Sequence, residues 1–118
     1  MPDLDPSDPL VALREENRIR LLESQGEWTH RLDAIRSDRR RARGPLDPDF
    51  SEQAVQRQND QALDALDERG RAALVAIRAA LSRIESGNYG WCVACGAPIA
   101  LERLRAEPTA DHCVACSR

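Results

Sequence analysis

Residues 63–84 read LDALDERGRAALVAIRAALSRI, and the spacing of their apolar side chains is regular. The repeat runs at intervals of 3, 4, 4, 3, 4 and 3 residues through Leu63, Leu66, Gly70, Leu74, Ile77, Leu81 and Ile84. Alternation between three and four residues places side chains along one face of an α-helix. Gly87-Asn88 is typical of a helix C-terminus. This pattern predicts one long amphipathic helix over about residues 51–86.

The chain upstream predicts a second long helix over residues 9–43. Asp8-Pro9 is a favourable start, because Asp supplies an N-cap oxygen and proline suits the first helical position. The apolar stripe has a weak patch around Asn17 and Ser24, and Gly44-Pro45 predicts the end of the helix. The apolar residues of the stripe are Leu10, Leu13, Leu21, Trp28, Leu32 and Ile35.

Two such helices joined by a short loop predict an antiparallel hairpin in which each stripe covers the other. The expected fold is therefore mainly α, a long helical hairpin (coiled coil) over residues 9–86 with a tip loop at 44–50. Residues 1–8 are rich in proline and aspartate and are expected to form a flexible tail.

Counting outward from the middle of the tip loop predicts which residues of the two helices face each other. Trp28 is then expected near Leu66, and Gly70 near Ser24. Small residues at the second pair would let the two backbones approach closely.

All four cysteines fall in residues 87–118, as two C-x2-C pairs separated by a 17-residue spacer: Cys92, Cys95, Cys113 and Cys116. Each pair can direct two thiolates at one ion, and Zn²⁺ suits four thiolates in a closed tetrahedron. The sequence therefore predicts a C-terminal four-cysteine zinc finger holding one structural Zn²⁺. A closed shell leaves no position for a substrate water, so a catalytic metal is not expected.

Other uses of these cysteines are less favoured. Two disulfides do not suit a reducing compartment, and no βαβ pattern surrounds either pair, as a thioredoxin-like redox motif requires. His112 is expected to be a turn histidine, because four thiolates already satisfy the ion. Gly90 and Gly96 flank the first pair, where a tight turn often needs positive φ.

Composition and simple sequence patterns narrow the classes of protein to which the chain can belong. The chain has 118 residues, 31% charged and 3% aromatic side chains, and a net charge of −3. No apolar run is long enough for a membrane span, and the N-terminus has no signal-peptide pattern, so a cytoplasmic protein is expected. No Ser/His/Asp pattern, glycine-rich phosphate loop or open metal site appears, so the protein is not expected to be an enzyme.

Intrachain pairing of the two helices would use both apolar stripes, which predicts a monomer.

The zinc region carries a family resemblance. Gly90-Trp-Cys-Val-Ala-Cys-Gly-Ala-Pro-Ile99, then Arg103-Leu-Arg-Ala-Glu-Pro-Thr-Ala-Asp111 and Cys113-Val-Ala-Cys116 resemble the DksA/TraR C4-type zinc finger proteins. The helical hairpin matches that family only in pattern and length.

The resemblance implies a regulator that binds bacterial RNA polymerase through its secondary channel and alters transcription initiation. Family members of the DksA kind carry Asp-x-x-Asp-x-Ala at the hairpin tip, which reaches the polymerase active site. Here the motif falls on Asp49, Glu52 and Ala54, with glutamate in place of the second aspartate. Physically, Asp49 and Glu52 also fit a capping box for the second helix. Arg69 falls where family members place an arginine that contacts the channel rim.

The resemblance also concerns ppGpp, which some members bind through basic side chains at the zinc end. The corresponding positions here are Ala76, Glu107 and Ser117. A polyphosphate needs cations to replace its hydration, so the sequence predicts that this site is not formed.

A zinc-ribbon nucleic-acid binder is the alternative function. The cluster Arg36–Arg43 would support it, although cations at a helix C-terminus also complement the helix dipole. The net charge of −3, the acidic tip and the scarcity of Phe and Tyr for base stacking argue against it, and direct sequence-specific DNA contact is not expected.

Overall fold

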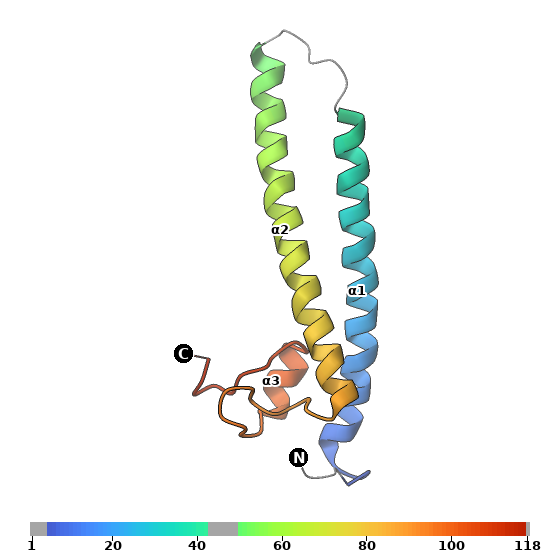
Figure 1. Ribbon diagram of the computed structural model, residues 1–118, viewed down its shortest axis with the longest axis vertical. Coiled ribbons are helices and arrows are strands. Elements are labelled where there is room, and N and C mark those ends of the chain that lie inside the picture. Colours follow the sequence, from blue (N-terminus) through green and yellow to red (C-terminus); the bar gives the residue numbers. More distant parts are fainter. Residues whose placement is uncertain (1–4, 43–49, 118) are drawn as a thin grey trace. The chain divides into compact units, whose positions relative to one another are not determined.

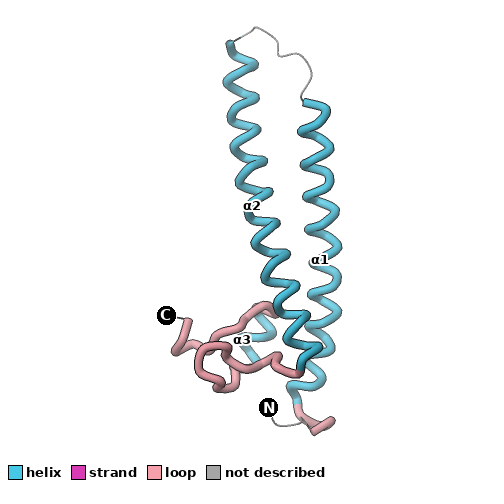
Figure 2. The backbone as a smooth tube through the Cα atoms, viewed as in Figure 1, coloured by secondary structure: helices cyan, strands magenta, loops and turns pink. Residues whose placement is uncertain are grey.

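The computed structural model describes residues 5–42 and 50–117, with the side chains of residues 41–56 left undescribed. The described chain is mainly helical, as predicted, with α1 (Pro9–Ala42), α2 (Phe50–Ser86) and the short α3 (Leu101–Ala106) (Figure 1). Loops connect the end of α2 to α3 and continue to the C-terminal region (Figure 2). Two compact units make up the chain, the base unit (Met1–Gln25 with Val75–Arg118) and the distal unit (Gly26–Leu74).

The start of α1 follows from Asp8-Pro9. The Asp8 carboxylate accepts a hydrogen bond from the backbone N–H of Leu10 at 2.9 Å. The N–H of Val11 donates to the Asp8 carbonyl at 2.9 Å. Both bonds satisfy first-turn donors that have no partner within the helix. The predicted stop at Gly44-Pro45 lies outside the described residues.

The end of α2 is set by Gly87, which has a φ of 80°. The N–H of Gly87 donates to the Ile84 carbonyl at 3.3 Å, and the N–H of Asn88 donates to the Arg83 carbonyl at 2.8 Å. These two bonds form a Schellman motif, which needs a left-handed residue directly after the helix. Gly87 therefore ends the helix where the sequence indicates.

The core of the distal unit lies between the second half of α1 and the first half of α2, which run antiparallel (Figure 1). Leu32, Ile35 and Leu74 are buried there, and Trp28, Leu63 and Leu66 pack against them. The Arg31 guanidinium carbon lies 4.9 Å from the centroid of the Trp28 ring, so the two side chains form a cation–π interaction. Arg39 and Asp64 form an ion pair across the two helices.

The predicted partner of Gly70 is wrong. A Cβ atom built on Gly70 would lie 2.8 Å from Leu32 Cδ2 and 3.0 Å from Trp28 Cε3, so this glycine faces two large side chains. The predicted pairing requires that the last turn of α1 and the first turn of α2 lie level with each other. Instead the first turns of α2 extend beyond the last turn of α1 (Figure 1), which offsets the register.

The base unit has its own core, built from the first half of α1, the end of α2 and the segments around α3. Its buried apolar residues are Leu10, Leu13, Leu21, Ile77, Ala80, Tyr89, Ile99, Leu104 and Ala110. Asn17 is also fully buried, at 0% exposure. The sequence treats Asn17 as a weakness in the apolar stripe, whereas the structure places it at the centre of this core.

Candidate metal centre

Tight turns position the four cysteines. The N–H of Gly96 donates to the Cys92 carbonyl at 2.9 Å, and the N–H of Cys116 donates to the Cys113 carbonyl at 3.1 Å. Gly96 adopts a φ of 76°, as predicted for a turn of this kind. Each C-x2-C pair is therefore folded so that both of its thiols turn toward one point.

Gly90, which precedes the first cysteine pair, has a different role from Gly96. Gly90 has a φ of 95°, and a Cβ at this position would lie 2.9 Å from Leu10 Cδ1. Glycine is needed here both for its backbone conformation and for the close approach of α1.

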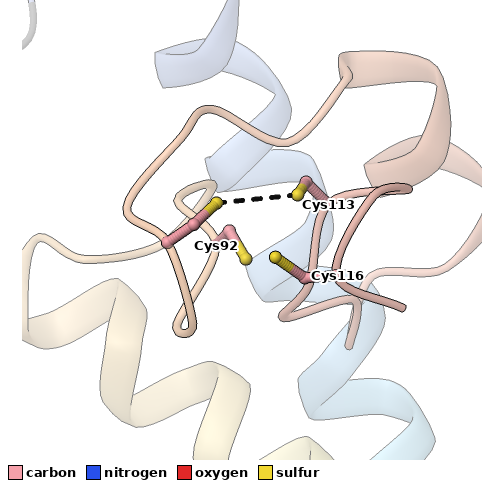
Figure 3. Close-up of side chains that lie close together, drawn as sticks. Cys92, Cys113 and Cys116 are labelled. Atoms are coloured by element: carbon pink, nitrogen blue, oxygen red, sulfur yellow. Dashed lines mark hydrogen bonds between the residues drawn. The ribbon is translucent and has the colours of Figure 1, made fainter. Parts of the chain in front are cut away.

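The four thiol sulfurs lie within 4.8 Å of one another, and the Sγ atoms of Cys95 and Cys113 are 3.7 Å apart. Figure 3 shows the side chains of Cys92, Cys113 and Cys116 close together. A tetrahedral Zn²⁺ with Zn–S bonds of about 2.3 Å separates its sulfurs by about 3.8 Å. A disulfide needs about 2.05 Å between sulfurs, and all four cysteines are free thiols. The geometry fits a single zinc ion held by four thiolates.

The thiols of the cluster differ in pKa, because backbone N–H groups favour the thiolate of Cys92 and neighbouring thiols favour the neutral form of Cys116. Backbone N–H groups, first that of Cys113 and then those of Cys95 and Ala94, lower the pKa of Cys92 to about 6. Hydrogen bonds with the thiols of Cys113, then Cys95 and Cys92, favour the neutral form of Cys116 and raise its pKa to about 12. Thiolates at this spacing repel one another, and a dication at their centre would favour all four charged forms.

Like that of Cys116, the pKa of Cys95 is raised by neighbouring thiols. A hydrogen bond from the Ala97 backbone lowers its pKa, but hydrogen bonds with the Cys92 and Cys113 thiols outweigh it, so the pKa is raised. Its side chain is exposed, whereas that of Cys92 is buried.

His112 is not a member of the thiol cluster. Its Nδ1 atom lies 2.7 Å from the Asp111 carboxylate, and its ring is partly exposed. Within the described residues, the four cysteines are the group placed to hold a metal ion. The chemistry of the donor set, four soft thiolates in a closed shell, suits a structural ion.

A buried polar network joins α1 to the segments that carry the cysteines. Asn17 Nδ2 donates to the Tyr89 hydroxyl at 2.9 Å and to the Leu104 carbonyl at 3.0 Å. The Tyr89 hydroxyl donates in turn to the Pro108 carbonyl at 2.7 Å. Arg20 Nη1 donates to Asn17 Oδ1 at 3.1 Å. Every hydrogen-bonding atom of the Asn17 amide is therefore satisfied, as burial requires.

The residues predicted at the hairpin tip lie at the edge of the described chain. Asp49 lies outside the described residues, and so does the capping box that it would form. Glu52 and Ala54 belong to the first turns of α2, but their side chains are not described. Arg69 is exposed on α2, in the distal unit.

Sequence reasoning missed Asn17 and Tyr89 as members of this buried network, and Arg103, whose Nε donates to the His112 carbonyl at 3.0 Å. A signal for Asn17 was available, because it stands four residues after Leu13 and four before Leu21, at a core position. No comparable signal marked Tyr89, whose partners lie far away in the sequence.

Helices α1 and α2 in a hairpin, with a C-terminal cluster of four cysteines, define the class of α-helical hairpin proteins that carry a C4 zinc module. Residues 87–118 match the prokaryotic dksA/traR C4-type zinc finger, and residues 18–84 match the DnaK suppressor protein-like N-terminal domain. The chain therefore belongs to the DksA/TraR C4-type zinc finger family. This family holds one zinc ion through four cysteines, which the cluster described above supplies.

Individual relatives agree with this assignment. The chain is 33% identical over 69 residues to the RNA polymerase-binding transcription factor DksA of Haemophilus influenzae, an alignment that covers 58% of this chain and 48% of the relative. It is 39% identical over 49 residues to the protein of the same name from Escherichia coli K12, covering 42% of this chain and 32% of the relative. The chain thus spans about half or less of the curated relatives it matches.

Solved structures match over more of the chain. Transcription factor DksA2 from Pseudomonas aeruginosa aligns with a TM-score of 0.76 and 32% identity, covering 99% of this chain and 88% of that structure. The DnaK suppressor protein from Agrobacterium tumefaciens C58 aligns with a TM-score of 0.59 and 41% identity, covering 87% and 89%. Among the residues described, no helix has a segment that could cross a membrane.

Proposed function

We propose that this protein binds RNA polymerase and regulates transcription initiation without being an enzyme. The observation that carries the proposal is the match to proteins named RNA polymerase-binding transcription factor DksA, together with the helical hairpin and zinc module that the family shares. Binding to an assembled polymerase also suits a chain with a net charge of −3, for which phosphate backbones are unfavourable ligands.

The proposed route is the secondary channel of the polymerase, entered by the hairpin tip. A helical hairpin is narrow, and internal packing such as that of Leu32, Ile35 and Leu74 keeps its two helices together. Asp49 and Glu52 would bring negative charge near the active site, with Ala54 completing the tip motif. Carboxylates there can act on bound cations or on nearby basic side chains.

Arg69 is the proposed contact with the channel rim. Its side chain is exposed on α2, whereas the neighbouring Arg71 forms an ion pair with Asp67 at 3.0 Å. Arg69 is thus the cation of this pair of arginines that is available to a partner protein.

We further propose that the protein lacks the ppGpp site of some family members. Ala76 and Ser117 offer no cation, and Glu107 is an exposed carboxylate that accepts a hydrogen bond from the Thr109 hydroxyl at 2.7 Å. A polyphosphate at these positions would meet negative charge where it requires positive charge. Isothermal titration of ppGpp into the protein bound to polymerase should show no micromolar binding attributable to this site.

The test of function is binding to core RNA polymerase followed by a transcription assay. The double variant Asp49→Asn/Glu52→Gln removes the tip charge and keeps similar side-chain shapes. Glu27→Gln/Asp33→Asn is the matched control, because both residues are exposed on α1. We expect all three proteins to bind polymerase, and the tip variant alone to lose regulation.

Two outcomes would contradict the proposal. Failure of the unmodified protein to bind core polymerase would remove its basis. A mobility shift on duplex DNA, with a salt dependence of several released counterions, would instead favour the nucleic-acid-binding alternative.

A further inference from the structure

The backbone segment Pro108–His112, here called the delivery segment, leads directly into Cys113 and therefore positions the second pair of thiols. It contains no helix or strand, and its start forms a turn in which the N–H of Ala110 donates to the Glu107 carbonyl at 3.0 Å. Four of its five carbonyl groups nevertheless accept hydrogen bonds from other parts of the base unit. These bonds decide where Cys113 and Cys116 lie.

The two ends of the delivery segment are held by side chains. At its start, the Tyr89 hydroxyl donates to the Pro108 carbonyl at 2.7 Å. At its end, Arg103 Nε donates to the carbonyl of His112 at 3.0 Å, one residue before Cys113. A bond from a charged donor is among the stronger protein hydrogen bonds.

The middle of the segment is held to the first cysteine pair and to α2. The N–H of Val93, inside the first pair, donates to the Asp111 carbonyl at 2.9 Å. Arg83 Nη2 lies 3.4 Å from the Thr109 carbonyl, a longer and weaker contact. The Val93 bond couples the two cysteine pairs directly and cannot be removed by changing a side chain.

Tyr89 is itself fixed by burial and by Asn17. It is 1% exposed, and the Asn17 amide donates to its hydroxyl oxygen at 2.9 Å, which leaves the hydroxyl proton for Pro108. Arg103 is partly buried on α3. Neither side chain is a metal ligand, yet each fixes the backbone that presents two ligands.

We propose that Tyr89 and Arg103 are positioning residues of the metal centre, which set the affinity of the four thiols for their metal by holding the delivery segment. Residues that orient metal ligands from outside the coordination shell typically change affinity by about 10- to 100-fold when they are replaced. The proposal is independent of the binding partner of the protein, because it concerns the base unit alone.

The test compares Arg103→Met with Arg105→Met in the full chain. Both arginines lie on α3, but the Arg105 side chain is exposed and makes no hydrogen bond to residues 108–112 within the described part of the chain. Zinc affinity is measured by competition with a chromophoric chelator, at a temperature where circular dichroism shows every variant folded. The visible spectrum of the Co²⁺-loaded proteins reports whether coordination remains tetrahedral.

We expect Arg103→Met to bind zinc about tenfold more weakly than the unmodified protein, and Arg105→Met to bind it equally well. Tyr89→Phe removes the bond to Pro108 together with the bond from Asn17, and loss of the one bond that holds the delivery segment should weaken zinc binding about threefold. The Co²⁺ spectra should stay tetrahedral throughout, because the thiols are unchanged. A purely structural role would lower the melting temperature and leave zinc affinity in the folded protein unchanged.

Equal zinc affinities for Arg103→Met, Arg105→Met and Tyr89→Phe would overturn the proposal. If Arg103→Met fails to fold, Tyr89→Phe and Arg103→Lys decide the question. Lys keeps a charged donor but does not reproduce the position of Arg Nε, so Arg103→Lys should bind zinc more weakly than the unmodified protein. An affinity equal to that of the unmodified protein in both variants would contradict the proposal.

Discussion

The Asn17 amide nitrogen lies 2.9 Å from the hydroxyl oxygen of Tyr89, a residue 72 positions further along the chain, and donates a hydrogen bond to it. Both side chains are almost completely buried. Through this bond, and through a second from Asn17 to the Leu104 carbonyl, α1 is joined to the region that holds the cysteines. A polar side chain at this core position favours one particular docking of the helix, since any other would leave its amide unsatisfied.

Asn17→Ala should destabilise the protein by about 2 kcal/mol, because it leaves the buried Leu104 carbonyl without that donor and creates a small cavity. Denaturant unfolding measures the change. Asn59→Ala on α2 is the control, since Asn59 is exposed, and it should shift stability by no more than about 0.5 kcal/mol. Equal effects of the two substitutions would show that the buried network contributes nothing specific.

Two glycines within the long helices should respond to alanine in opposite directions. A Cβ at Gly70 would lie 2.8 Å from Leu32 Cδ2, whereas a Cβ at Gly26 would meet nothing within 4 Å. Gly26→Ala should therefore stabilise the protein by up to about 1 kcal/mol through helix propensity. Gly70→Ala should destabilise it by about 1–3 kcal/mol through overpacking.

Thermal melts monitored by circular dichroism at 222 nm compare these two glycine variants. A stabilising Gly70→Ala would mean that the two helices do not approach as closely as the structure shows. A destabilising Gly26→Ala would mean that its position in α1 requires glycine.

The periodicity of the sequence was sufficient for the two long helices and the cysteine cluster, because both depend on local spacing. Leu63, Leu74 and Ile77 follow a helical repeat, and two C-x2-C pairs have the spacing of a zinc site. The register was not accessible, because it depends on how far α2 extends beyond α1 before the side chains pack. Gly70 accordingly faces Trp28 and Leu32 instead of Ser24.

The role of Asn17 was hidden for a related reason. Its partners lie 72 and 87 residues away in sequence. The sequence around Asn17 therefore shows only a polar residue that interrupts an apolar stripe. Only the folded base unit shows that the interruption is satisfied. The delivery segment was equally hidden, because its course is set by Tyr89 and Arg103 and not by a regular secondary structure.

The stability of the protein should depend on the protonation of Tyr89 at high pH. Burial raises the pKa of Tyr89 above the ordinary value of 10.0. The hydrogen bond from Asn17 lowers this pKa, but its effect is smaller than that of burial. The neutral hydroxyl is therefore favoured by folding, and its contribution is fully present below about pH 10 and is lost as pH rises through the folded pKa. Denaturant unfolding at pH 8 and pH 11 should show this loss.

Tyr89→Phe is the control for the alkaline effect. It removes the titrating group, so its stability should change less between the two pH values than that of the unmodified protein. An identical pH dependence in both proteins would show that Tyr89 does not titrate differently in the folded and unfolded states.

Removal of zinc should affect the two units unequally. A strong chelator should increase amide hydrogen exchange across residues 87–117, because four close thiols no longer share a cation. Protection around Leu32, Ile35 and Leu74 should persist, since their packing does not involve the cysteines. Cys95→Ser should behave like the chelated protein, and zinc should restore protection only in the unmodified chain.

Unchanged exchange at residues 87–117 after complete zinc removal would contradict a structural role for the metal. Atomic absorption on the same samples establishes the zinc content, so retained protection cannot be attributed to residual ion.

Site-specific photo-crosslinking to core RNA polymerase tests the proposed function most directly. A photoreactive phenylalanine analogue replaces Phe50, the first residue of α2 beside the acidic tip positions, and a control analogue replaces the exposed Ala79 further along α2. We predict that crosslinks from position 50 map to polymerase peptides around the catalytic magnesium, and that those from position 79 do not. Crosslinks from position 50 confined to the outer surface of the polymerase, or their absence in a complex that forms, would contradict insertion of the tip.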